Sequence, residues 1–276
     1  MSCRPLIVVP ITKSYMEEGS VFLNSVRKTN PSIPVHVITH DLTDEDFKEW
    51  ENVTKVVIEP PCDTEFRRVR TSRFRYAMDI KDEFNVVGLF DADMCLLRDI
   101  NKFFKMAETG TILACSNNTL LRYIKKDFDA MQVDVNPRID VVHPTFSTVP
   151  IFVNASLNEE WLTAIWENPT GNDLDIPNLY AESLRLMDKV FLLNSYAWTN
   201  IHHTMIKPET FARKTHNGLY SHQGEPVYCL HGHLGDPAYL KELIEPMKKN
   251  YGYYPKYVES AENCVKVLKE TYDTYK

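Results

Sequence analysis

The sequence predicts an α/β fold in which one mostly parallel, Rossmann-like sheet has helices on both faces. Short, nearly continuous apolar runs recur along the 276 residues, a pattern typical of strands that helices cover on both sides. Amphipathic stretches alternate with these runs in the first half of the chain, as they do in a doubly wound sheet. We find no internal repeat and no linker, so we expect a single domain over residues 1–276.

The elements follow from these two patterns in chain order. Strands are expected at 6–11, 35–39, 55–58, 86–90, 111–115, 149–153, 190–193 and 227–230, each rich in Val, Ile, Leu or Phe. Helices are expected near 16–29, 43–51, 66–81, 157–168, 178–188 and 236–249. Beyond them an apolar stripe at helical spacing predicts a terminal helix docked on the body, formed by Ala261, Val265, Leu268 and Tyr272.

Composition excludes several classes of protein. The chain is 43% hydrophobic and 25% charged, with 31 basic against 38 acidic residues, so it is an ordinary globular protein with a net charge of -7. This charge gives no support to nucleic-acid or anionic-membrane binding. No apolar run approaches the ~20 residues of a membrane helix, and no signal peptide is evident. Six cysteines without a C-x-x-C pair fit reduced thiols, so we expect a cytoplasmic protein of undetermined oligomeric state.

Two carboxylates follow the expected strand at 86–90. Residues i and i+2 of an extended segment point the same way, so Asp91 and Asp93 can address one ligand with the small Ala92 between them. Open α/β sheets bind ligands at the carboxyl ends of their strands. Because oxygen ligands suit Mg²⁺ or Mn²⁺, the pair indicates a cation that bridges to a diphosphate. The alternative is a polar turn after a strand.

The helix expected before this strand is rich in arginine, with five in residues 66–75 of an acidic chain. Helical periodicity places Arg70 and Arg73 on the inner face beside Phe74, whereas Arg68 and Arg75 point away. An inward guanidinium needs an anion, which is either the acidic pair or the phosphates of a nucleotide. The alternative is that each arginine extends to solvent along its aliphatic stem.

A pair of histidines follows the last expected strand. If the segment stays extended, His231 and His233 lie on one side, with a glycine between them that lets backbone approach a phosphate. A neutral imidazole is a reasonable third protein ligand for Mn²⁺. Either histidine could instead be structural.

Together these segments resemble the GT-A fold of nucleotide-sugar glycosyltransferases, and family 8 in particular, the glycogenin and bacterial galactosyltransferase type, over about residues 5–240. The matching stretches are 7–12 with Tyr15, 22–26 with Asn30 and Pro31, 90–94 as the metal motif, and 230–233 as the metal histidine. The resemblance implies that the nucleotide is held by Pro10, Ile11, Thr12, Tyr15, Arg70, Arg73 and Ala92. It implies that Asp91, Asp93 and a histidine, for which we favour His231, bind the metal, while His233 contacts phosphate or the donor sugar.

The sequence departs from the family in the sugar pocket. Residues 146–154 resemble a segment usually written Phe-Asn-Ser-Gly, but the Asn and Gly are replaced, which implies a different pocket. The family's Asp-Gln pair has no clean counterpart, and Glu182 and Asp188 are the candidate catalytic residues at about the right distance. The resemblance further implies a nucleotide-binding half at about 1–115, an acceptor-binding half at about 116–240, and C-terminal helices at 236–276.

The leading hypothesis is a metal-dependent hexosyl- or pentosyltransferase that uses Mn²⁺ or Mg²⁺. It would move a sugar from a nucleoside diphosphate, most simply UDP, to a hydroxyl of a glycan or small acceptor. One alternative is a nucleotidyltransferase that makes the sugar nucleotide, but such enzymes usually carry a Gly-rich first loop and residues 10–14 contain no glycine. Another is a catalytically silent sugar- or nucleotide-binding module. Glu182 acting as a base would indicate inversion, whereas the family indicates retention, and the sequence leaves this open together with the sugar and the acceptor.

Overall fold

The computed structural model describes residues 3–57, 65–120, 144–167, 177–178, 180–181, 184–198, 212–221 and 223–276. Its contacts divide the chain into two compact units, each assembled from separate stretches of sequence. The first unit comprises Met1–Ser14, Ile33–Asp91 and Asn101–Leu193, and the second comprises Tyr15–Ser32, Ala92–Ile100 and Asn194–Lys276. The boundary after Asp91 therefore falls inside the Asp-x-Asp motif.

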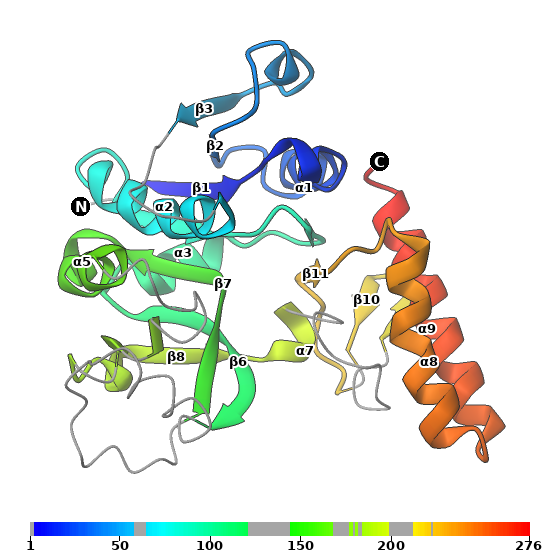
Figure 1. Cartoon of the computed structure of the whole chain (residues 1–276). Coiled ribbons are helices and arrows are strands. Elements are labelled where there is room, and N and C mark those ends of the chain that lie inside the picture. The colour runs from blue at the N-terminus through cyan, green and yellow to red at the C-terminus, as the bar shows by residue number, and fades with distance from the viewer. Residues whose placement is uncertain are drawn as a thin grey trace. The chain divides into compact units, whose positions relative to one another are not determined.

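The first unit is built on a seven-stranded sheet (Figure 1). In spatial order its strands are β3 (Val53–Val57), β2 (Val35–Thr39), β1 (Pro5–Pro10), β4 (Val86–Leu89), β7 (Pro144–Asn154), β6 (Ile112–Leu120) and β8 (Val190–Leu193). Strand β7 is antiparallel to both of its neighbours, and the other neighbours are parallel. The mostly parallel α/β sheet that the sequence predicts is confirmed.

Helices cover both faces of this sheet because its strands are apolar on both sides. Helices α2 (Glu65–Asp79) and α5 (Glu159–Glu167) lie over one face, where Phe74 and Trp161 meet edge to face with ring centroids 6.3 Å apart (Figure 1). Helix α3 (Asn101–Ala107) covers the other face, where Phe104 meets Phe152 of β7 at 5.1 Å. The two faces of β7 thus contribute to different layers of the core.

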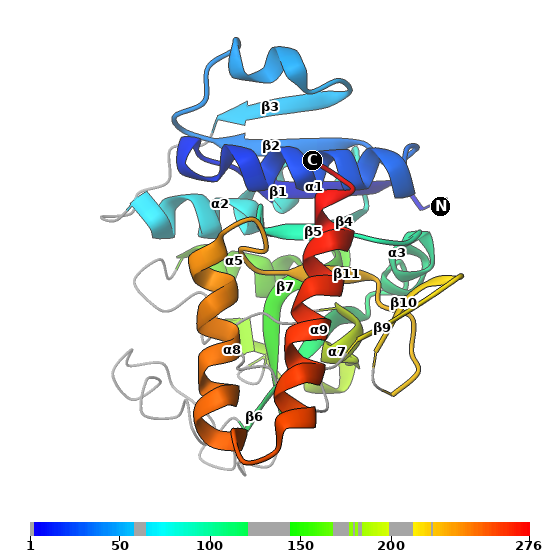
Figure 2. The ribbon, with the colours of Figure 1, turned by 90° about the vertical axis from the view of Figure 1, so that its right-hand side faces the viewer.

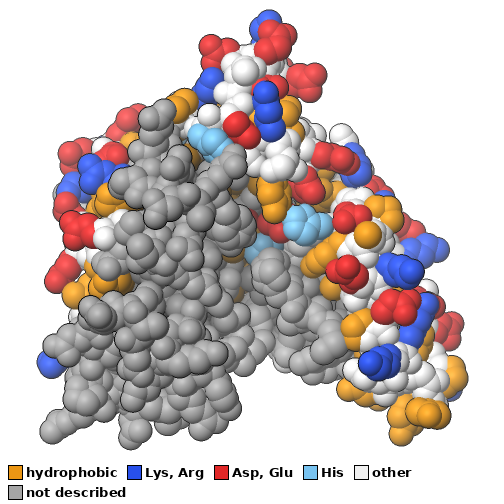
Figure 3. Space-filling model, viewed as in Figure 1, with side chains coloured by type: hydrophobic (Ala, Val, Ile, Leu, Met, Phe, Trp, Pro, Cys, Tyr) orange, Lys and Arg blue, Asp and Glu red, His pale blue; other side chains and the backbone are white. Residues whose placement is uncertain are grey.

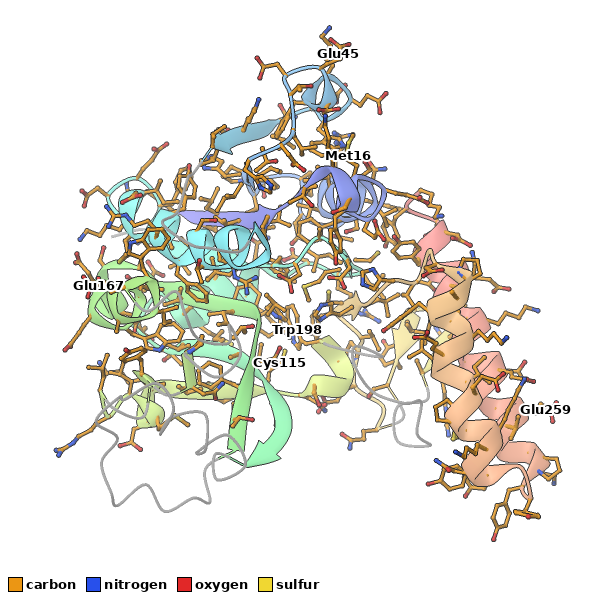
Figure 4. The ribbon with its side chains drawn as sticks, in the orientation of Figure 1. Met16, Glu45, Cys115, Glu167, Trp198 and Glu259 are labelled. Atoms are coloured by element: carbon orange, nitrogen blue, oxygen red, sulfur yellow. The ribbon has the colours of Figure 1, made fainter. Side chains whose placement is uncertain are left out.

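The second unit is mainly helical. Its elements are α1 (Met16–Thr29), β5 (Met94–Leu96), α7 (Ser195–Trp198), β9 (Arg213–Thr215), β10 (Gly218–Tyr220), β11 (Cys229–His231), α8 (Pro237–Tyr251) and α9 (Pro255–Asp273). Strand β5 pairs antiparallel with β11, and β9 pairs with β10. The start of α1 at Met16 and the end of α7 at Trp198 are labelled in Figure 4. Helix α1 contacts β5, where the buried hydroxyl of Ser25 accepts a hydrogen bond from the backbone N–H of Leu96 (2.9 Å).

Helices α8 and α9 run side by side in opposite directions (Figure 2). Helix α8 begins where Asp236 accepts a hydrogen bond from the backbone N–H of Ala238 and Pro237 occupies the first turn. The predicted stripe of the terminal helix is buried in α9, at Ala261, Val265, Leu268 and Tyr272, which confirms its docking face. Hydrophobic side chains gather at the turn between the two helices (Figure 3), and the exposed tyrosines there are Tyr251, Tyr253, Tyr254 and Tyr257.

Each expected strand is present, with ends shifted by a few residues. The helix expected at 43–51 is wrong, because only the 3₁₀ turn η2 (Asp46–Glu49) forms there. The carboxylate of Asp46 accepts hydrogen bonds from the backbone N–H and the hydroxyl of Thr43, and this local bonding competes with a longer helix. Of the helix expected at 178–188, residues 179, 182 and 183 lie outside the described residues, whereas 178, 180 and 181 are helical and 184–186 are not. Its described end is the 3₁₀ turn η5 (Met187–Lys189), and further 3₁₀ turns are η1 (Lys13–Tyr15) and η4 (Ser156–Asn158).

Across the described ranges, none of the helices combines the length and the apolar character that crossing a bilayer demands.

Candidate metal and nucleotide site

The first acidic residue of the motif is held by an arginine of the same unit. Beyond β4 the buried Phe90 leads to Asp91, whose side chain is 14% exposed. Nη1 of Arg73, from the middle of α2, donates to Oδ1 of Asp91 at 2.6 Å, and the Arg73 side chain is fully buried. This charge-assisted bond fixes the orientation of the carboxylate.

The helical phase predicted for this helix is correct for the arginines whose side chains are described. Arg73 faces inward, whereas Arg75 is 46% exposed and pairs with Asp79 on the same helix. Within the described part of the chain, Nε and Nη2 of Arg73 are buried and lack a hydrogen-bond acceptor. These two nitrogens carry three N–H donors, and a buried donor without an acceptor is costly, so the ion pair with Asp91 is the contact that compensates the buried guanidinium.

The second acidic residue meets a histidine within the second unit. The register of β5 and β11 pairs Met94 with His231, and the backbone N–H of Gly232 donates to the carbonyl of Asp93 at 2.9 Å. Nε2 of the fully buried His231 lies 3.2 Å from Oδ1 of Asp93, a residue that is itself only 8% exposed. The late strand therefore brings a histidine to the Asp-x-Asp motif.

The other histidine approaches the same carboxylate from its second oxygen. Nε2 of His233 lies 3.9 Å from Oδ2 of Asp93, and its Nδ1 lies 3.5 Å from Oε1 of Glu18 in the first turn of α1. The hydrogen bond with Glu18 raises the pKa of His233 despite partial burial, which acts in the opposite direction. The same bond lowers the pKa of Glu18.

Aromatic side chains surround the His233 ring. The ring centroid of Tyr15 lies 5.7 Å away in a tilted arrangement, and that of Tyr239 lies 5.5 Å away, edge to face. Burial, followed by the charge of Asp93, raises the pKa of Tyr239 to about 12. The neighbouring Gly232 has φ +130°, and a Cβ there would lie 2.5 Å from Oη of Tyr239, so glycine is required where the chain turns between the two histidines.

The loop expected to hold the nucleotide begins at the end of β1 in the first unit. Pro10 and Ile11 are buried, and the backbone N–H of Ile11 donates to the carbonyl of Ile38 at 3.0 Å. The hydroxyl of Thr12, half-buried, shares a hydrogen bond of 2.9 Å with the hydroxyl of Ser14. The backbone of this loop is therefore well anchored.

The remaining predicted residues are placed less completely. Ala92 is buried, Asp188 is exposed in η5, and Arg70 is described only as a backbone position of α2. Glu182 lies outside the described residues. Sequence reasoning missed Glu18 and Tyr239, because an acidic residue in a first helical turn and a tyrosine in an amphipathic helix have ordinary structural roles.

The donor set is one that could hold a divalent metal ion. Asp93 offers carboxylate oxygens, and His231 offers an imidazole nitrogen beside them, a mixed oxygen and nitrogen set. Asp91, two residues earlier in the chain, has a second carboxylate of the same type. The three residues named from the sequence thus have the chemistry of a metal site.

No family model and no curated protein matches the chain. Among similar solved structures, the apo bifunctional glycosyltransferase WbbM has a TM-score of 0.55 and 11% identity over 90% of this chain, which spans only 51% of WbbM. Mouse xyloside xylosyltransferase 1 has a TM-score of 0.50 at 11% identity, covering 84% of this chain and 98% of its own. The galactosyltransferase LgtC, solved with donor and acceptor sugar analogues, has a TM-score of 0.50 at 13% identity, and the match covers 94% of this chain and 95% of LgtC. The chain therefore has the GT-A fold of these glycosyltransferases.

Proposed function

We propose that the protein is a metal-dependent glycosyltransferase that moves a sugar from a nucleoside diphosphate, UDP in the simplest case, to a hydroxyl of a glycan or small acceptor. The observation that carries this proposal is the contact between Asp93 and His231, which the pairing of β5 with β11 creates directly after the Asp-x-Asp motif. The GT-A fold supports the same chemistry without identifying it.

In this proposal Asp91, Asp93 and His231 hold Mn²⁺ or Mg²⁺. A divalent ion bound there would stabilise the negative charge that develops on a leaving diphosphate. Arg73 would serve the nucleotide site through Asp91, because its fully buried guanidinium keeps the Asp91 carboxylate in one orientation. Arg70, one helical turn earlier, is proposed to assist in the same role.

The nucleotide is assigned to the first loop and the start of α1. Pro10, Ile11 and Thr12 would contact it through an anchored backbone, and Ala92 would line it. The ring of Tyr15 would stack on the base, and the half-exposed His233 would face the phosphates. Residues up to about 115 would then serve the donor, and residues from about 116 to 240 the acceptor.

Chemistry at the sugar is assigned to Glu182, with Asp188 as a second candidate. A carboxylate acting as general base on the acceptor hydroxyl would invert the anomeric centre.

Free thiols at Cys3, Cys95, Cys115, Cys229 and Cys264 support a reducing, cytoplasmic environment for the enzyme.

A donor panel tests the proposed function. The protein is incubated with individual sugar nucleotides and Mn²⁺, and release of nucleoside diphosphate is measured. We expect slow hydrolysis of one UDP-sugar, abolished by EDTA and by Asp93→Asn, while Asp79→Asn on the exposed side of α2 leaves it intact. Binding of a donor without any turnover would identify a silent binding module instead. Turnover that is unchanged in Asp93→Asn would disprove the metal assignment.

A further inference from the structure

The first turn of α1 carries two adjacent glutamates that point in different directions. Oε1 of Glu17 lies 2.8 Å from Nζ of Lys276, and its side chain is 73% exposed. The side chain of Glu18 is only 21% exposed, and its Oε1 lies 3.5 Å from Nδ1 of His233. Glu17 thus forms a solvent-exposed ion pair, whereas its neighbour Glu18 forms a partly buried contact with a histidine beside the candidate metal site.

The contact with Glu18 determines which nitrogen of His233 is available. When Nδ1 carries its proton toward a carboxylate, the lone pair of a neutral imidazole is on Nε2. That atom is the one near Oδ2 of Asp93, at 3.9 Å. The rings of Tyr15 and Tyr239 pack around the imidazole and restrict its rotation.

Asp93 therefore lies between two imidazoles, with His231 at one carboxylate oxygen (3.2 Å) and His233 at the other (3.9 Å). Two neighbouring ligands of one octahedral ion, each about 2.1 Å from the metal, lie about 3 Å apart. Nε2 of each histidine thus lies within 4 Å of an oxygen of Asp93, and a small movement of the His233 ring toward Asp93 would bring its nitrogen to the spacing of ligands around a single ion.

We propose that Glu18 is a positioning residue that orients His233 as a second nitrogen ligand of the metal, in place of the phosphate contact assigned to His233 above, an inference that rests on the proposed function. Metal-binding histidines usually donate their other N–H to a carboxylate, which fixes the ring and makes the ligating nitrogen more basic. Nitrogen ligands favour transition metals, so two histidines select Mn²⁺ over Mg²⁺ more strongly than one.

Metal titration of the protein without nucleotide tests this role. Mn²⁺ is added to metal-free protein, and free Mn²⁺ is measured by electron paramagnetic resonance for the wild type and for Glu18→Ala, Glu17→Ala, His233→Ala and the double variant Glu18→Ala/His233→Ala. We expect Glu18→Ala to weaken Mn²⁺ binding about 10- to 100-fold. The matched Glu17→Ala variant should stay within about twofold of the wild type, because its contact is an exposed ion pair.

The double variant tests whether Glu18 acts through His233. Since the two residues then form one unit, adding Glu18→Ala to His233→Ala should cause no further loss of affinity. Glu18→Gln should recover part of the affinity, because its amide oxygen still accepts a hydrogen bond from Nδ1. Competition with Mg²⁺ should show a lower preference for Mn²⁺ in His233→Ala than in the wild type. Thermal melting of each metal-free variant establishes that it is folded.

The outcomes separate this inference from the proposed function. If Asp93→Asn abolishes Mn²⁺ binding but folded Glu18→Ala binds like the wild type, the positioning role is disproved and the metal site stands. Losses that simply add in the double variant also disprove it. If Asp93→Asn still binds Mn²⁺ with wild-type affinity, the proposed metal site itself is disproved.

Discussion

The ion pair between Arg73 and Asp91 makes a stability prediction that does not depend on any ligand. Arg73 is fully buried, and Asp91 is the carboxylate that the structure places against it. Asp91→Ala removes this counter-charge and leaves a guanidinium that keeps its charge at any ordinary pH. Arg73→Met removes the guanidinium and leaves a carboxylate that is 14% exposed and can therefore be hydrated.

The burial of the two partners sets the size of each effect. Opposite charges about 4 Å apart in a medium of effective dielectric about 20 attract by about 4 kcal/mol, and removing one partner of a buried pair costs about 3–5 kcal/mol. We expect Asp91→Ala to cost about 3–5 kcal/mol and Arg73→Met about 1–3 kcal/mol, because water reaches only the carboxylate. The double variant should cost no more than about 2 kcal/mol, because methionine fills much of the arginine's volume without a charge.

Urea unfolding of metal-free protein in EDTA, followed by circular dichroism, measures these free energies. The two single variants together should lose at least about 4 kcal/mol and the double variant about 2 kcal/mol, so the coupling is at least about 2 kcal/mol. The exposed pair of Arg75 and Asp79 on the same helix is the control, with an expected coupling of about 0.3–0.5 kcal/mol. Losses at Arg73 and Asp91 that add to within about 0.5 kcal/mol would refute the reasoning.

Three further predictions concern other parts of the structure. Arg73→Lys should slow donor hydrolysis more than Arg75→Lys, because a point charge does not replace the directed donors of a buried guanidinium; equal rates would contradict this. Burial lowers the pKa of His36 in the folded protein, so His36 binds a proton at a higher pH in the unfolded chain than in the folded one. The free energy of unfolding should therefore fall as the pH drops below about 6.5. Urea unfolding of a His36→Gln variant should show a smaller fall over the same pH range. Gly232→Ala should lower the free energy of unfolding by about 1–3 kcal/mol more than Gly224→Ala, because an added Cβ at Gly232 would meet Tyr239. Gly224 is the control, since it also has a positive φ but has no atom within 4 Å of an added Cβ. Similar shifts of the melting temperature in the two variants would contradict an effect of Tyr239.

The sequence predicted the features that depend on local pattern. Apolar runs identified the strands of the sheet because strands covered on both faces are apolar throughout. Helical periodicity gave the inward direction of Arg73, because one face of α2 must pack on the sheet. Strand β5 was missed because it has only three residues and pairs with a strand far away in the chain.

Contacts between distant segments limited the prediction of the site. The pairing of β5 with β11 could not be deduced from periodicity, so the sequence did not decide how His231 meets Asp93. Glu18 gave no signal, because acidic residues are common in a first helical turn, where they interact favourably with the helix dipole. Only the fold shows that one of two adjacent glutamates turns toward His233.

The pairing of β5 with β11 also has a consequence for the order in which the protein acquires its parts during synthesis. Every strand of the seven-stranded sheet has been made by Leu193, whereas Cys95 of β5 packs with residues that the ribosome adds later, among them Leu230, Leu234 and Leu268. Domains generally begin to fold from the N-terminal side as they emerge from the ribosome. Asp93 is therefore synthesised early, whereas His231 and His233, which contact its carboxylate, are added only when translation is nearly finished. If the proposed metal site is correct, a nascent chain arrested before β11 would carry the strands of the first unit but lack the histidine ligands, and binding of the metal would be among the last steps of biogenesis.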